Sequence, residues 1–168
     1  EVGGPALVHV DAYRLGGGGD IDDLDRVSFT VSPKPGTFSR PVAVTYTRAW
    51  LERNGAWRQA DGRLRFAVFG LYANHQNSVT VTARFGDGST HVEQLSLASP
   101  AYAGPAAVYA TPEVRTARGA ASPGFDYFMV QNGLSTPAVL DTDGHLRWIG
   151  TGVADSYSST FLADAFFV

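Results

Sequence analysis

The sequence predicts an all-β chain of short antiparallel strands. Apolar and polar residues alternate with a period of two in several runs, the pattern of strands that bury one face. Turn signals separate these runs about every 8 to 12 residues, as in sandwiches and barrels. The 168 residues include 19 Gly and 9 Pro, which suits many turns. No window longer than about ten residues shows the apolar period of a helix, so little helix is expected.

Composition bounds the class of protein. Hydrophobic residues make up 44% of the chain and charged residues 17%, which is a globular composition. The length suits one ordinary domain, or one compact domain with a smaller satellite. A net charge of -3 argues against nucleic acid or an anionic membrane as the main partner. Without Cys, disulfides and thiolate metal sites are excluded. No apolar run approaches the roughly 20 residues of a membrane span.

Strand signals begin near the amino terminus and become regular after a break. An edge strand is expected within residues 6–10, before the glycines at 16–19 interrupt regular structure. Alternating runs follow at residues 27–31, 42–47 and 64–69. The run at 42–47 is expected to continue toward Trp50, and Asn54-Gly55 is expected to form a two-residue type I′ turn.

The clearest hairpin of the first half joins residues 78–85 and 90–97 through the turn at 86–88. Val79, Val81 and Ala83 fall on one face of its first strand, so that face is expected to be buried. Several such strands suggest a sandwich of the immunoglobulin-like kind. The core candidates share an inward position in these runs: Val31, Val44, Tyr46, Phe66, Val68, Leu71, Val79, Val81, Val92 and Leu95.

The second half begins with a change of composition. Pro and small residues dominate residues 98–124, which favours an extended connection. Strand signals resume at 125–131, 138–141 and 145–149, with an Asp143-Gly144 turn between the last two and a further run at 160–168. These runs predict a meander that opens a propeller blade or an unfinished sheet of something larger. We therefore expect a sandwich at 1–97, a linker at 98–124 and truncated first blade strands at 125–168.

Two segments together resemble the bacterial arylsulfotransferases, also called aryl-sulfate sulfotransferases. The first is VFGLY at 68–72 followed by NSVTV at 77–81. It is similar to the V-x-G-L-x-P…N-x-V-x-L hairpin of the family's amino-terminal β-sandwich, with Ala73 where the family often has Pro. The second, AVLDTDGHLRW at 138–148, is similar to the V-x-D-x-x-G-x-x-R-W turn that opens the family's propeller. Residues 161–168 resemble the next strand of that blade, so the resemblance covers about residues 63–168.

The resemblance implies that the full protein moves a sulfuryl group from one phenol to another by a ping-pong route. A histidine would be transiently sulfated while other His and Arg side chains hold the sulfate oxygens, because an imidazole is a competent carrier and cations neutralise the transferring group. In the family these residues project from later blades, so none is matched to this sequence. We assign no catalytic, cofactor-binding or metal-binding residue and expect no cofactor. Whether this chain alone is an enzyme stays open.

The histidines are scattered and show no metal-ligand spacing. His145 follows the Asp143-Gly144 turn and is expected to be a half-exposed strand residue. His75 is expected in a loop at residues 73–77, either as an ordinary loop residue or in contact with the propeller or a partner.

Asp20, Asp22, Asp23 and Asp25 form an acidic cluster whose oxygens suit Ca²⁺, but the full D-x-D-x-D-G loop is absent. A solvated acidic turn that caps one helical turn is the favoured interpretation, and calcium binding stays open. The Asp-x-Asp-Gly run at 141–144 likewise fits a hairpin turn better than a metal site.

Other motifs give weaker signals. The glycines at 16–19 lack the Lys-Ser/Thr and the strand-to-helix context of a phosphate-binding loop. Trp50, Trp57 and Trp148 are interpreted as buried anchors, with a platform for a sugar or phenol as the alternative.

We expect this chain to be the non-catalytic leading part of an arylsulfotransferase-like enzyme. Its partner would be the remainder of the propeller or a second copy, and phenolic sulfate would bind only the full-length protein. The alternatives are a secreted β-sandwich module that recognises carbohydrate or protein, and a propeller protein without catalysis. The chain begins at Glu1 without Met, which is compatible with a removed leader and a secreted or periplasmic location. A free blade edge promotes aggregation, so Phe166 and Phe167 are expected to be covered.

Overall fold

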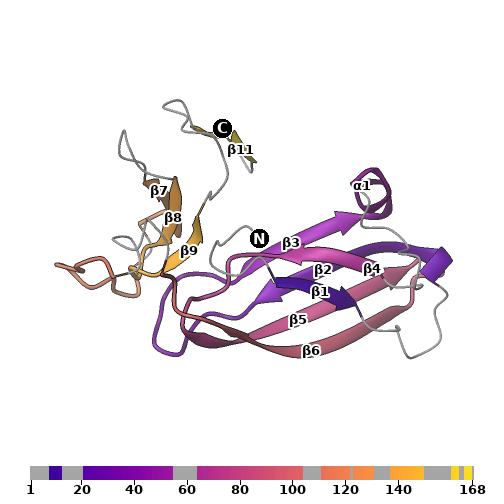
Figure 1. Cartoon of the computed structure of the whole chain (residues 1–168), viewed down its shortest axis with the longest axis horizontal. Helices are drawn as coiled ribbons and strands as arrows, with labels where there is room; N and C mark the ends of the chain where they lie inside the picture. The colour runs from indigo at the N-terminus through magenta and orange to yellow at the C-terminus, as the bar shows by residue number, and fades with distance from the viewer. Residues whose placement is uncertain are drawn as a thin grey trace.

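Antiparallel strands dominate the computed structural model, which describes residues 8–12, 21–54, 64–103, 111–121, 123–130, 137–149, 160–162 and 165–167. Figure 1 shows an elongated group of strands, β1 to β6, and a smaller group, β7 to β9, that stands at one end of it. The all-β prediction is confirmed.

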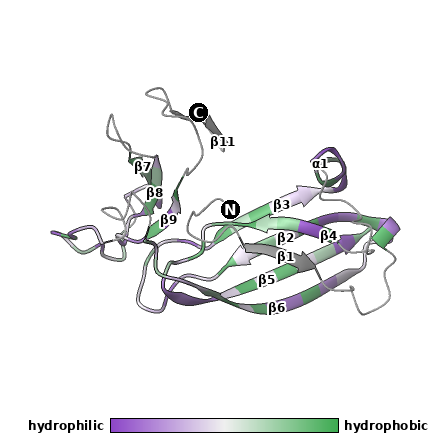
Figure 2. Cartoon of the chain, viewed as in Figure 1, coloured by the Kyte–Doolittle hydropathy of each residue, from purple (hydrophilic) through white to green (hydrophobic). Residues whose placement is uncertain are grey.

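The larger sheet has four strands in the order β3-β2-β5-β6, all antiparallel. Its members are β2 (Leu24–Val31), β3 (Val42–Thr47), β5 (His75–Phe85) and β6 (Thr90–Ser99). Burial alternates along β5, and the predicted inward face of Val79, Val81 and Ala83 is confirmed. Figure 2 shows the same alternation as hydrophobic and hydrophilic residues that follow one another along β6. Period-two patterning therefore gives this sheet one buried and one wet face.

A second, two-stranded sheet covers the buried face. It pairs β1 (Val8–Ala12) with β4 (Leu64–Val68), so the expected amino-terminal strand is confirmed for residues 8–10. Phe29 of β2 lies at the centre of the core, with its ring centroid 6.1 Å from that of Tyr46 and 5.5 Å from that of Phe69. Burying such a ring contributes about 1.5 to 3 kcal/mol. The buried core members are Leu24, Val27, Phe29, Val31, Tyr46, Leu51, Leu64, Phe66, Val68, Leu71, Val79, Val81, Ala83 and Phe85.

The predicted core needs correction in β6. Val92 is 56% exposed, because it lies opposite Thr82 on the wet face of the sheet. Leu95 and Leu97 point the other way and pack against the core while remaining partly exposed, as does Val44. An isolated Val in an alternating run does not show which parity faces inward, and the pairing register decides it.

The run after β3 is helical, contrary to the expected extension of the strand toward Trp50. Helix α1 (Arg48–Arg53) begins where the Thr47 hydroxyl accepts a hydrogen bond from the Trp50 amide, 3.3 Å away. Asn54 is the C-cap with φ -98°, so the expected type I′ turn is wrong at this residue. Leu51 is the residue of the helix that enters the core.

The tryptophans are less buried than expected. Trp50 is 36% exposed and stacks on Tyr46 with a centroid distance of 4.5 Å. Trp148 is half-buried, and Trp57 lies outside the described residues. Beneath Trp50, burial raises the pKa of Tyr46 to about 12, and its hydroxyl donates to the Ala67 carbonyl at 2.8 Å. Trp50 therefore covers the edge of the core instead of anchoring its centre.

The acidic cluster includes one helical turn, as predicted. A 3₁₀ helix, η1 (Ile21–Asp23), leads into β2, with Asp22, Asp23 and Asp25 exposed to solvent. The Gly86 amide donates to the Asp23 carbonyl at 2.8 Å, which ties this turn to the β5–β6 hairpin. Asp20 lies outside the described residues.

The smaller sheet is a meander of three antiparallel strands in the order β7-β8-β9. Its strands are β7 (Tyr127–Val130), β8 (Ala138–Asp141) and β9 (Leu146–Ile149). Ala138, Leu140, Leu146 and Ile149 form a separate small core, against which Tyr102 packs. This sheet shares no strand with the sandwich.

The last run is divided into two strands where one was expected. β10 (Thr160–Leu162) pairs with β11 (Ala165–Phe167) as a two-stranded sheet of its own. The expected burial of Phe166 and Phe167 concerns side chains outside the described part of the structure. Among the described helices, none has the length and apolar character needed to cross a membrane.

Candidate functional site at the joint between sandwich and meander

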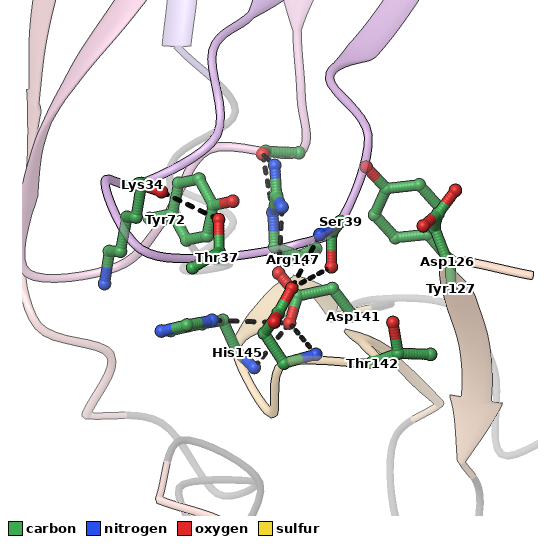
Figure 3. A network of polar contacts seen from close by, with 12 residues as sticks. Lys34, Thr37, Ser39, Tyr72, Asp126, Tyr127, Asp141, Thr142, His145 and Arg147 are labelled. Carbon is green, nitrogen blue, oxygen red and sulfur yellow. Dashed lines mark hydrogen bonds and ion pairs between the residues drawn. The ribbon is translucent and has the colours of Figure 1, made fainter. Parts of the chain in front are cut away.

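Most of the long-range polar contacts gather where the meander meets the sandwich. We call this region the polar joint. From the sandwich it includes residues 32–41 between β2 and β3, and residues 69–77, which run from the β4–β5 loop into β5. Arg118, Asp126 and residues 141–147 of the meander lie against them, and Figure 3 shows the centre of this network. The contacts join positions up to 105 residues apart in the chain. Tertiary structure alone brings these groups together.

Arg147 is the centre of the polar joint. Its Nε and Nη2 both donate to the carbonyl oxygen of Gly70, at 2.9 and 2.6 Å, and its Nη1 donates to Asp141 Oδ2 at 2.9 Å. The guanidinium lies over the ring of Tyr72, 3.7 Å from the centroid. Arg147 and Asp141 are both buried, so each charge depends on the other and on the carbonyl.

The backbone around Gly70 is shaped to present that carbonyl. Gly70 has φ +77°, and a Cβ there would lie 2.9 Å from Cγ2 of Val42. Asn77 holds the loop from the other side, because its Oδ1 accepts from the Tyr72 amide at 2.8 Å and its Nδ2 lies 3.1 Å from the Tyr72 carbonyl. The Tyr72 hydroxyl is buried and makes no hydrogen bond with the described residues.

The β8–β9 turn is built on Asp141. Its Oδ1 accepts from the amides of Asp143 and His145, at 3.1 and 2.8 Å, and Gly144 turns the chain with φ +89°. This is the hairpin chemistry expected for the Asp-x-Asp-Gly run. The same carboxylate thus shapes the turn with one oxygen and neutralises Arg147 with the other.

Asp143 connects the turn directly to the sandwich. Its carboxylate accepts from the amides of Phe38 and Ser39, the latter at 2.7 Å, and from the Ser39 hydroxyl. Burial alone would raise the pKa of Asp143, but the hydrogen bonds from Ser39 and Phe38 outweigh it and lower that pKa. The ionised form of this carboxylate is therefore the one that fits the polar joint.

A second carboxylate, Asp126, makes the same kind of connection just before β7. It forms ion pairs with Arg40 of the sandwich and with Arg118, whose Nη1 is 2.9 Å from Asp126 Oδ1. Burial again opposes ionisation, but hydrogen bonds from Arg40 and Arg118 lower the pKa of Asp126. The Tyr127 hydroxyl also donates to the Arg40 carbonyl, at 2.6 Å. The meander is therefore attached to the sandwich at two carboxylates.

Both histidines that the sequence singled out lie at this joint. His75 is the first residue of β5, so its expected place in a loop is wrong. Its ring makes an edge contact with Tyr72, with centroids 5.7 Å apart. His145 is half-exposed as expected but lies in the turn before β9, with its ring 5.2 Å from that of Tyr72. The sequence does not predict that the two rings contact the same tyrosine, because His75 and His145 are 70 positions apart in the chain.

The arrangement serves to hold two sheets together. Within the described ranges, no group of three or more His, Asp and Glu side chains is placed to hold a metal ion. Asp141, Asp143, His75 and His145 were recognisable as candidates from the sequence. Arg147 was not, although it lies within the AVLDTDGHLRW motif at 138–148. An Arg flanked by Leu146 and Trp148 in a four-residue strand was the available signal, since a buried charge needs a partner.

Comparison with known proteins adds one finding. A family model described as the arylsulfotransferase Ig-like domain matches residues 20–100. The matched segment contains β2 to β6, together with both sandwich segments of the polar joint. A search of curated proteins found no match.

Proposed function

We propose that this chain is the amino-terminal, non-catalytic part of an enzyme that transfers a sulfuryl group between phenols, because residues 20–100 match the family model of the arylsulfotransferase Ig-like domain. In this proposal residues 125–168 are the first strands of a propeller, and the sandwich holds them in place through the polar joint. The phenolic sulfate would bind to later blades.

The observation that carries the proposal is the set of hydrogen bonds made by Arg147. Its guanidinium donates to the Gly70 carbonyl and to the Asp141 carboxylate, so it connects the sandwich to the meander. Asp143 and Asp126 are occupied in the same way by groups of the sandwich and by Arg118. Side chains already bound to one another are suited to positioning a neighbouring sheet and poorly suited to holding a substrate.

The family resemblance also supports a location outside the cytoplasm, secreted or periplasmic. A chain without Cys needs no disulfide to fold there. The partner would be the rest of the propeller or a second copy of the chain.

The test is sulfuryl transfer from 4-nitrophenyl sulfate to a second phenol, measured by the release of nitrophenolate. The assay is run with this chain and with the longest product of its gene. We expect turnover by the longer product and none by residues 1–168. Turnover by residues 1–168 alone would contradict the non-catalytic assignment. Absence of turnover in both, over a panel of phenols, would favour a sandwich module that binds carbohydrate or protein.

A further inference from the structure

We propose that Lys34, His75 and His145 form a binding site for a tetrahedral oxyanion, a sulfate or phosphate group, beside the ring of Tyr72. The inference rests on the geometry of the described residues and holds whether or not the proposed function does. The three side chains come from three segments: the β2–β3 loop, the start of β5 and the β8–β9 turn.

All three basic groups surround one buried ring. The Lys34 ammonium lies 4.9 Å from the Tyr72 centroid, and the rings of His75 and His145 make edge contacts with Tyr72 at 5.7 and 5.2 Å. Figure 3 shows Lys34 and His145 extending to the same side of Tyr72. Each of the three side chains is half-buried, so solvent and a small ligand still reach them.

The cluster has unused donors. No described carboxylate forms an ion pair with Lys34 or His75. Asp141, the carboxylate whose charge acts on Lys34, is fully buried. It already accepts hydrogen bonds from Arg147, from two backbone amides and from His145 Nδ1 at 3.3 Å. Since His145 Nδ1 faces Asp141, its Nε2 is the nitrogen available to a ligand. The Lys34 ammonium is the permanent charge, and the two imidazoles add charge when they are protonated.

Mutual repulsion within the cluster supports an anionic ligand. Burial lowers the pKa of Lys34, which Asp141 only partly offsets. Burial, Lys34 and His145 together lower the pKa of His75. An anion among these groups would oppose the part of the His75 shift that comes from the positive charge of Lys34 and His145. Three donors on separate segments match the several oxygens of a tetrahedral oxyanion better than the two of a carboxylate, and charge-assisted hydrogen bonds are the strong ones.

The test follows the Hε1 resonances of His75 and His145 by NMR while sodium sulfate, sodium phosphate or sodium acetate is added at constant ionic strength with sodium chloride. His91, near the other end of the sandwich on β6, is the internal reference. We expect saturable shifts of His75 and His145 with sulfate or phosphate, a raised pKa for His75, and no saturable shift of His91. Of sulfate and phosphate, the anion whose titration saturates at the lower concentration is the one that the site prefers. A response to acetate equal to that of sulfate and phosphate, or none to any anion, would overturn the proposal.

The control is a matched pair of substitutions. Lys34→Gln and Arg84→Gln each remove one positive charge, but Arg84 lies at the far end of β5, about 30 Å from His75 at the usual strand rise of about 3.3 Å per residue. We expect Lys34→Gln to weaken anion binding about tenfold or more and Arg84→Gln to leave it unchanged. Equal weakening by both substitutions would show general charge attraction and no site. Denaturant unfolding of both variants verifies that each is folded.

Discussion

The guanidinium of Arg147 and the carbonyl of Gly70 are 77 positions apart in the chain and are joined by two hydrogen bonds, of 2.9 and 2.6 Å. One residue belongs to the last strand of the meander and the other to the loop between two strands of the sandwich. The contact is buried, so water does not compete for it. Because hydrogen bonds are stronger in the low-dielectric interior, this contact is expected to contribute strongly to holding the two sheets together.

Replacing Arg147 with Met should destabilise the chain by about 3 to 5 kcal/mol, because Asp141 would remain buried without its cation. Urea unfolding measures the change. The double variant Arg147→Met with Asp141→Asn should recover part of the loss, since it removes the unpaired charge. Arg84→Met, on the exposed face of β5, should change stability by about 0.5 kcal/mol or less. Equal losses for Arg84→Met and Arg147→Met would contradict a special role for the buried pair.

Gly70→Ala should cost more than Gly88→Ala. Both glycines have positive φ, +77° and +86°, so both substitutions pay a similar backbone penalty of about 1 to 2 kcal/mol. Only at Gly70 would the new methyl group meet Val42, at 2.9 Å, which adds about 1 to 3 kcal/mol of overpacking.

Thermal unfolding of the two glycine variants gives the difference. Adding Val42→Ala to Gly70→Ala should recover part of the lost stability, because it removes the methyl groups that the new Cβ meets. Adding it to Gly88→Ala should bring no such recovery. If Val42→Ala lowers the stability of both variants by the same amount, the contact between Gly70 and Val42 is not the cause.

Asn77→Ala should destabilise the sandwich by about 3 kcal/mol, because it leaves the buried amide and carbonyl of Tyr72 without their partner. Its side chain also contacts Leu97 and Ser99 of β6, so the loss should reach the hairpin. Hydrogen exchange of the Tyr72 amide should quicken with the substitution. The neighbouring Gln76 is exposed, and Gln76→Ala should change stability by about 0.5 kcal/mol or less. Comparable effects at the two positions would refute the assignment.

Acid should weaken the polar joint. The pKa values of Asp126 and Asp143 are lowered below the ordinary 3.8 in the folded chain. The unfolded chain therefore binds protons first. The stability contributed by these carboxylates is fully present above about pH 5 and is lost as the pH falls through 3.8 toward their folded values.

The free energy of unfolding, measured between about pH 6 and 2, should fall on the acid side of this range. Asp143→Asn should lower stability at neutral pH and reduce the slope below about pH 4. An unchanged slope in Asp143→Asn would show that this carboxylate is not a source of the acid sensitivity.

The strands that alternate strongly were predictable, because their pattern is local. Val79, Val81 and Ala83 were assigned to the buried face, and the Asp143-Gly144 turn was placed correctly between β8 and β9. Local pattern failed where pairing or capping decided. Val92 depended on its register with Thr82, and Trp50 lies in a helix because Thr47 caps it.

The candidate site was predictable only in part. Asp141 and Asp143 were recognised as hairpin residues, since an Asp side chain bonds to amides two and four positions on. Their second roles were not visible, because the partners Ser39 and Arg147 come from segments that the sequence does not connect.

The sequence by itself determined that this chain is all-β, which faces most of its longer strands bury, and which family its sandwich resembles. These features depend on residue spacing within a strand or turn, where neighbours in sequence are neighbours in space. Only the tertiary structure decided that Arg147 reaches Gly70 and that Lys34, His75 and His145 surround Tyr72. Those contacts join distant segments, and a buried charge shows its partner only once the chain has folded around it.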